Sequence, residues 1–246
     1  MLALAFLIGC APAVVRVPVA PANVARANEL AREADLAFAR RDYYASLIKY
    51  LEAGRLNPNS QYIFNKLGIA YSQLKYYAEA GAAFQRSVAL DPKFAYAHNN
   101  LGTVYFALDD KRNAEKCFRK AISIQDNAAS FHINLGTLYF EKGKYEKGMA
   151  EIRKGLLLDP GVLERGEGVS LAASSSKLQS TERSYSMARV YASMGDVDRA
   201  VESLRQALSN GFTDLAAIRK EPDFDKIRQD AKFVDFMREA SLITKN

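Results

Sequence analysis

The sequence predicts an all-α solenoid, which is a stack of antiparallel helix pairs. The best-formed pair lies between Phe64 and Pro92, where apolar residues recur at helical spacing and the second run ends at an Asp-Pro step. The pattern of this pair returns downstream at an interval of 34 residues. A period of that length is typical of helix pairs that bury their apolar faces by stacking on one another.

Small residues inside each pair support this prediction. Two antiparallel helices approach closely only where small side chains lie at their crossing. Gly68 and Ala80 have this role in the best-formed pair, and Phe84 is one of the large residues that fill the space beside them. The next two pairs carry the same pattern, except that Gly148 replaces the alanine in the fourth pair.

The apolar spacing divides the chain into five segments. Residues 161–180 break the period because they contain three glycines and a run of serines, so we interpret them as an irregular insertion. The tail groups Ile218, Phe224, Ile227, Phe233, Phe236 and Met237 around short helices that would cover the last pair. The predicted segments are an N-terminal signal and tether over 1–22, four helix pairs over 23–160, the insertion over 161–180, a fifth pair over 181–214 and capping helices over 215–246.

The residues at these offsets, Leu-Gly, Tyr, Ala, Phe and Pro in a 34-residue unit, resemble the tetratricopeptide repeat (TPR). The resemblance implies a right-handed α-solenoid of about five units. The first unit departs from it, with Glu33-Ala34 where the others have Leu-Gly, as terminal copies often do. The tail resembles the end-of-array segment that follows TPRs in many bacterial proteins.

Composition and residue types argue against catalysis. The chain is 49% hydrophobic and 25% charged, and its formal charge of +6 comes from basic residues interleaved with acidic ones, so we expect a solvated surface and no nucleic-acid partner. The two histidines, His98 and His132, are 34 residues apart at equivalent packing positions. Cys117 lies on an apolar helix face as a small packed residue. We therefore predict no catalytic residue, no metal site and no cofactor, and not an enzyme.

The N-terminus carries a possible lipid anchor. A short apolar run ends in Gly9 and Cys10, with Leu7 three positions before the cysteine, and this resembles the lipobox of bacterial lipoproteins. The resemblance implies cleavage before Cys10, which would become the lipidated first residue. The run lacks the preceding Lys or Arg of a secretory signal, and the alternative is an apolar N-terminus with a fortuitous cysteine. Prolines in residues 11–22 suit an extended tether.

The TPR resemblance also implies a binding groove, formed by residues of each first helix that lie off the packing stripe. Asn100 and Asn134 could each hold the amide and carbonyl of an extended peptide, as in the asparagine ladder of this family. The alternative is that Asn before Leu-Gly occurs in TPRs of every function. The predicted groove residues are Tyr62, Asn65, Lys66, Tyr96, Asn99, Asn100, Thr103, Phe106, Asn134, Thr137, Phe140, Tyr185 and Arg189.

These features predict a non-enzymatic scaffold that binds a peptide or protein partner in the groove. With Cys10 lipidated, it would be anchored on the periplasmic side of the bacterial cell envelope, similar in outline to TPR lipoproteins that act as pilotins or envelope assembly factors. The alternative is a soluble cytoplasmic TPR module in a regulatory complex. Too few basic positions match the family's carboxylate clamp, so we do not predict one.

Overall fold

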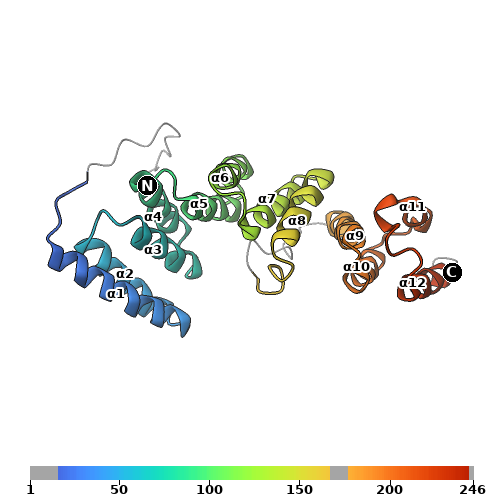
Figure 1. Ribbon diagram of the computed structural model, residues 1–246, viewed down its shortest axis with the longest axis horizontal. Coiled ribbons are helices and arrows are strands. Elements are labelled where there is room, and N and C mark those ends of the chain that lie inside the picture. The colour runs from blue at the N-terminus through green and yellow to red at the C-terminus, as the bar shows by residue number, and fades with distance from the viewer. Residues whose placement is uncertain (1–15, 167–176, 244–246) are drawn as a thin grey trace. The chain divides into compact units, whose positions relative to one another are not determined.

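The computed structural model describes residues 16–166 and 177–243, and the regular secondary structure in these ranges is helical (Figure 1). The predicted all-α fold of stacked helix pairs is confirmed. The chain divides after Asp126 into two compact units. Cys10, the apolar run before it and much of the predicted insertion lie outside the described residues.

The first unit contains three helix pairs, in which each helix packs mainly on its partner and then on the next helix along the chain. Side chains cap three of these helices, because Asp42, Ser60 and Asp110 each accept a hydrogen bond from the backbone three residues on. The helices are α1 (Pro21–Ala39), α2 (Tyr43–Leu56), α3 (Gln61–Gln73), α4 (Tyr77–Leu90), α5 (Ala95–Ala107) and α6 (Lys111–Ile124).

Helix α1 begins at Pro21, whereas the sequence pattern placed this proline in the tether. The physical reason is that proline is well suited to the first helical position, where its fixed φ matches the helix and its missing N–H would have no partner. The helix ends two residues before a turn in which Arg41 adopts a φ of 63°.

The crossings inside the α3–α4 and α5–α6 pairs of the first unit are each closed by a phenylalanine ring that lies on a glycine. A Cβ added to Gly68 would come within 2.6 Å of the ring of Phe84, and one added to Gly102 would come equally close to the ring of Phe118. Both rings are almost fully buried. Only glycine therefore lets these helices approach with the rings in place.

The second unit contains two helix pairs and a C-terminal segment. Its pairs are α7 (Ala129–Glu141) with α8 (Tyr145–Leu158), and α9 (Lys177–Met194) with α10 (Val197–Ser209). The inter-helix turns in this unit use Gly143 and Gly195 at positive φ, where the first unit uses Arg41, Lys75 and Asp109.

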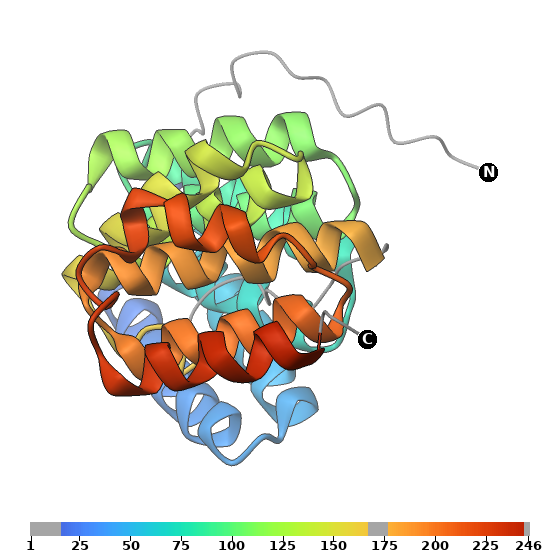
Figure 2. The ribbon, with the colours of Figure 1, turned by 90° about the vertical axis from the view of Figure 1, so that its right-hand side faces the viewer.

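The tail forms α11 (Leu215–Lys220), the 3₁₀ turn η1 (Pro222–Phe224) and α12 (Ala231–Ile243). Helix α12 lies beside α10, and η1 lies against α9 (Figure 2). The six apolar tail residues predicted to cover the last pair are all buried, including Phe224 and Phe236 in the main core of this unit. The tail therefore covers the last helix pair, which would otherwise expose its apolar face.

None of the helices in the described ranges is both long enough and apolar enough to cross a membrane.

Candidate partner-binding surface

In the first unit, the predicted groove residues lie on α3 and α5, one repeat apart. Tyr62 and Tyr96 are at equivalent positions in the first turns of these helices and remain 62% and 46% exposed. Phe94, just before α5, lies between them, with its ring centroid 5.0 Å from that of Tyr62 and 6.1 Å from that of Tyr96. We call Tyr62, Phe94 and Tyr96 the aromatic edge. Exposed rings of this kind offer large contact area at low entropic cost.

Asparagine amides connect α3 to α5 beside the aromatic edge. Asn100 donates from Nδ2 to Oδ1 of Asn65 at 3.0 Å and accepts from Asn99 at 3.4 Å. Asn65 and Asn99 are buried, whereas Asn100 is half-buried. Because a primary amide has two N–H groups, Asn100 keeps one N–H for a partner after bonding to Asn65. The asparagines thus join two repeats as well as offering a contact.

Farther along α5, Thr103 and Phe106 continue the same side of the helix at intervals of three residues. Thr103 donates its hydroxyl hydrogen to the carbonyl oxygen of Asn100 at 2.7 Å, and Phe106 is partly exposed. Together with Asn100 they form a short polar and aromatic strip that a partner can reach.

The predicted cation of this surface is already paired. Lys66 Nζ lies 2.9 Å from Oδ1 of Asp35 on α1, and Tyr50 donates its hydroxyl hydrogen to the same oxygen at 2.5 Å. Burial, with the Asp35 carboxylate as a second cause, raises the pKa of Tyr50, so this phenol stays protonated and remains a donor. A partner carboxylate would have to compete with Asp35 for Lys66.

In the second unit, the predicted groove residues on α7 are buried. Every residue of α7 from Phe131 to Phe140 is buried, which includes Asn134 and Thr137. Phe140 is not a groove residue in this structure, because its ring lies on Gly148 at the α7–α8 crossing. The missing Cβ of Gly148 provides the space for that ring. The exposed part of the predicted groove is therefore in the first unit.

Tyr185 and Arg189 on α9 are covered by the chain's own tail. The ring of Tyr185 stacks on Phe212 with centroids 4.4 Å apart. Burial, followed by the charge of Glu221, raises the pKa of Tyr185 to about 12. Arg189 contacts the carboxylates of Glu146, Glu221 and Asp223 at 2.8, 3.2 and 2.9 Å. Arg189 therefore holds the tail in place through internal ion pairs.

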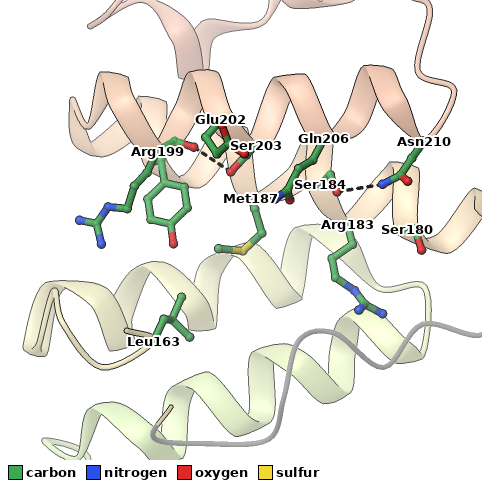
Figure 3. A pocket seen from close by; sticks show the side chains of 11 residues that line it. Leu163, Ser180, Arg183, Ser184, Met187, Arg199, Glu202, Ser203, Gln206 and Asn210 are labelled. Carbon is green, nitrogen blue, oxygen red and sulfur yellow. Dashed lines mark hydrogen bonds between the residues drawn. The ribbon is translucent and has the colours of Figure 1, made fainter. Parts of the chain in front are cut away.

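A cavity of about 470 Å³ opens between α9 and α10 (Figure 3). Its polar side chains are largely engaged within the protein. Arg199 contacts Asp196 and Glu164, and Arg183 pairs with Glu141. Ser203 donates to the carbonyl oxygen of Arg199 at 2.8 Å. The cavity is also lined by Leu163, Ser180, Ser184, Met187, Tyr191, Glu202, Gln206 and Asn210.

The histidines serve packing in separate repeats. His132 is buried, and its Nδ1 lies 2.7 Å from Oε2 of Glu151. His98 bonds through Nε2 to the carbonyl oxygen of Pro92 at 3.0 Å. Burial raises the pKa of the Cys117 thiol to about 11, which disfavours the nucleophilic thiolate. Within residues 16–166 and 177–243, no group of His, Cys, Asp or Glu could hold a metal ion.

Family models assign the repeats directly. Models of the tetratricopeptide repeat match residues 62–94, 95–127, 129–161 and 185–216, which together make up more than half of the chain. The chain belongs to the tetratricopeptide repeat family. TPR proteins in general mediate protein–protein interactions, and the TPR fold is typically a non-catalytic scaffold. The matches fall on the second to fifth predicted units.

Solved TPR structures share the fold at low sequence identity. The thermophilic TPR protein TTC0263 of Thermus thermophilus is 19% identical, with a TM-score of 0.54 over 88% of this chain and 99% of its own. A crystal structure of MamA is 21% identical, with a TM-score of 0.52 over 80% and 96%. These likenesses establish the fold alone. A search of curated protein sequences finds no match.

The sequence pattern missed two residues of this TPR surface. Phe94 belongs to the aromatic edge, but it lies in the loop before α5, outside the helical periodicity. Asp35 neutralises Lys66 from the preceding repeat, and no fixed spacing in the sequence indicates such a pair. Phe94 had one usable signal, because it is an aromatic residue two positions after the Asp91-Pro92 step, where the fourth unit has Val162 after Asp159-Pro160.

Proposed function

We propose that this protein is a non-enzymatic interaction scaffold that binds an extended segment of a protein partner on α3 and α5 of the first unit. The observation that carries this proposal is the half-buried Asn100, which keeps an N–H beside the exposed side of Thr103 and Phe106. A backbone carbonyl of an extended segment can accept from that N–H, and an apolar side chain can rest on Phe106.

Charge defines the chemistry of the partner. Lys66 is paired with Asp35, and Arg189 is held by three carboxylates of its own chain. Neither predicted cation is therefore available for an acidic tail without breaking an internal ion pair. The proposed ligand is an uncharged extended segment with apolar or aromatic side chains.

We further propose that the scaffold is a lipoprotein of the bacterial cell envelope, attached on the periplasmic side through acylated Cys10. The support is the lipobox-like sequence that ends at Cys10 and the proline-containing segment that follows it. Several acyl chains would anchor the protein stably. A pilotin-like or envelope-assembly role fits such an anchored TPR protein.

Selection from a random displayed-peptide library on the immobilised protein tests the binding surface. We expect enriched peptides to be uncharged and apolar, and their binding to fall on Asn100→Ala and Phe106→Ala but not on the control Tyr44→Ser, which changes an exposed ring on α2. Enrichment of acidic peptides, or binding unchanged in both α5 variants, would contradict the proposed site.

Metabolic labelling with an alkyne fatty acid in a bacterial host tests the anchor separately. Incorporation is expected for the wild type and should be lost in Cys10→Ser. Label retained in that variant would contradict lipidation at Cys10.

A further inference from the structure

The segment that precedes α1 is held against the first unit by a side-chain amide. Asn59, in the loop between α2 and α3, accepts from the backbone N–H of Val17 at 3.2 Å and donates from Nδ2 to the Val17 carbonyl oxygen at 2.6 Å. One asparagine thus satisfies both backbone groups of one residue. This is how an amide side chain recognises an extended chain.

A second contact fixes the direction of this segment. Arg16 Nη2 donates to the carbonyl oxygen of Leu90 at 3.1 Å, at the C-terminal end of α4. A cation is favourable there because the last carbonyl groups of a helix carry partial negative charge. We call Arg16, Val17, Asn59 and Leu90 the latch. The latch holds the chain across two neighbouring loops at one end of the helix pairs.

The aromatic edge lies at the same end. Tyr62 follows Asn59 by three residues, and Phe94 follows Leu90 by four. Lys93, between Leu90 and Phe94, is exposed and adds positive charge beside the rings, as does Arg16. One repeat downstream, the positions of Phe94 and Tyr96 hold only Ala128 and Ser130.

The length of chain before the latch limits how far this end lies from the N-terminal attachment. Cys10 precedes Arg16 by six residues, which reach at most about 22 Å when fully extended. If Cys10 carries the lipid, as proposed above, Arg16 lies within that distance of the attachment, and the latch holds the end of the helix pairs that carries the aromatic edge on the side of the bilayer.

We propose that the aromatic edge is a membrane-contact surface that rests in the interfacial zone of the bilayer to which Cys10 is attached. Tyrosine suits this zone because its ring is apolar and its hydroxyl stays hydrated, and nearby Lys and Arg side chains favour anionic headgroups. This inference rests on the proposed lipid anchor. It leaves the strip at Asn100, Thr103 and Phe106 for the protein partner.

Tryptophan fluorescence tests the surface directly, because the natural sequence contains no tryptophan. The full chain with Cys117→Ala keeps one cysteine, Cys10, which is coupled to a maleimide lipid in phosphatidylcholine–phosphatidylglycerol vesicles. Tyr96→Trp reports on the aromatic edge. Tyr44→Trp is the matched control. Tyr44 is 60% exposed and lies near the N-terminal end of α2, about 18 Å along the helix axis from Leu56 at the end that leads to Asn59 of the latch.

We expect coupling to shift the emission of Trp introduced at position 96 to shorter wavelength and brominated lipids to quench it, with neither effect at position 44. Equal quenching at both positions, or none at position 96, would overturn the membrane-contact surface. Adding Asn59→Ala should weaken quenching at position 96, and unchanged quenching would show that the latch does not orient the unit. Because coupling supplies the anchor chemically, these outcomes are independent of whether cells acylate Cys10.

Discussion

The third and fourth repeats close the same helix crossing with different side chains. In the third repeat, Phe118 of α6 lies on Gly102, and Phe106 of α5 stays partly exposed. In the fourth repeat, the position of Phe118 is taken by the smaller Ile152, which lies on Gly136. The crossing must be filled in both cases, because helix interfaces are close-packed.

Ile152 on α8 fills less space than a phenylalanine, and a side chain of the opposite helix, α7, fills the rest of the crossing in the fourth repeat. Gly148 replaces the alanine found at Ala114, and the ring of Phe140 lies in the space so opened. Phe106 and Phe140 are equivalent in sequence, yet the first is partly exposed and the second is 1% exposed. A residue's place in the repeat therefore does not decide whether it belongs to the surface or the core. The partner across the crossing decides it.

The largest expected effect is a difference in stability between alanine variants of Phe140 and Phe106. Phe140→Ala should lower the free energy of unfolding by about 3 to 5 kcal/mol, because it opens a cavity at a crossing. Phe118→Ala should cost a similar amount in the third repeat. Phe106→Ala, the matched control, should cost much less. Urea unfolding followed by circular dichroism measures all three, and equal losses for Phe106→Ala and Phe140→Ala would contradict the exchange of roles.

A substitution at Gly148 on α8 tests the same packing of Phe140 from the opposite helix. Alanine normally stabilises a helix relative to glycine, but here the new Cβ would overlap the ring of Phe140, so we expect a loss of about 1 to 3 kcal/mol. Adding Phe140→Leu should restore part of this loss. Thermal melting of the single and double variants checks the sign. A rise in melting temperature for Gly148→Ala alone would show that the ring is not held there.

The inter-helix turns give a smaller contrast between the two units. Lys75 holds a φ of 63° in the first unit and Gly143 one of 66° in the second. Gly143→Ala should destabilise by about 1 kcal/mol through backbone strain alone, since nothing lies within 4 Å of an added Cβ. Lys75→Gly should be neutral or slightly stabilising. Chemical denaturation of both variants measures the difference, and a loss from Lys75→Gly as large as that from Gly143→Ala would contradict this account.

His98 and His132 occupy equivalent repeat positions but have different partners, so we expect the two sites to contribute differently to the acid stability of the fold. The position facing His132 is Glu151, whereas the equivalent position in the third repeat is Cys117. The hydrogen bond with His132 holds the pKa of Glu151 below its ordinary value of 4.5. The folded state thus binds this proton less readily than the unfolded state, so the contribution to stability is present above pH 4.5 and is lost as pH falls through the lowered pKa.

Glu151→Gln should therefore reduce stability most near neutral pH, and the difference from wild type should shrink below pH 4.5. The equivalent His98 bonds to the Pro92 carbonyl and not to a carboxylate, so the third repeat has no matching pair. Melting temperatures measured from pH 3 to pH 7, a span set around that ordinary carboxyl pKa, test this. A difference for Glu151→Gln that stays constant across this range would contradict a role for the ionised pair.

The repeat and its packing glycines could be predicted from the sequence because both depend on local spacing. Residues at a fixed interval with a helical period must stack their apolar faces, whatever the partner is. The resulting register places Gly68 against Phe84 and Gly102 against Phe118, and the structure shows both contacts. The prediction that Tyr62, Asn65 and Asn100 lie together on a surface formed by α3 and α5 also depends on this register.

Only the tertiary structure decided which groove positions remain accessible. Phe140 is buried because of Gly148, Lys66 is neutralised by Asp35 of the previous repeat, and Arg189 is taken by the tail. Each outcome depends on a residue in another helix, and spacing along the chain carries no information about that residue. The sequence therefore determined the repeat and its packing stripe, whereas contacts between elements determined the surface that is left for a partner.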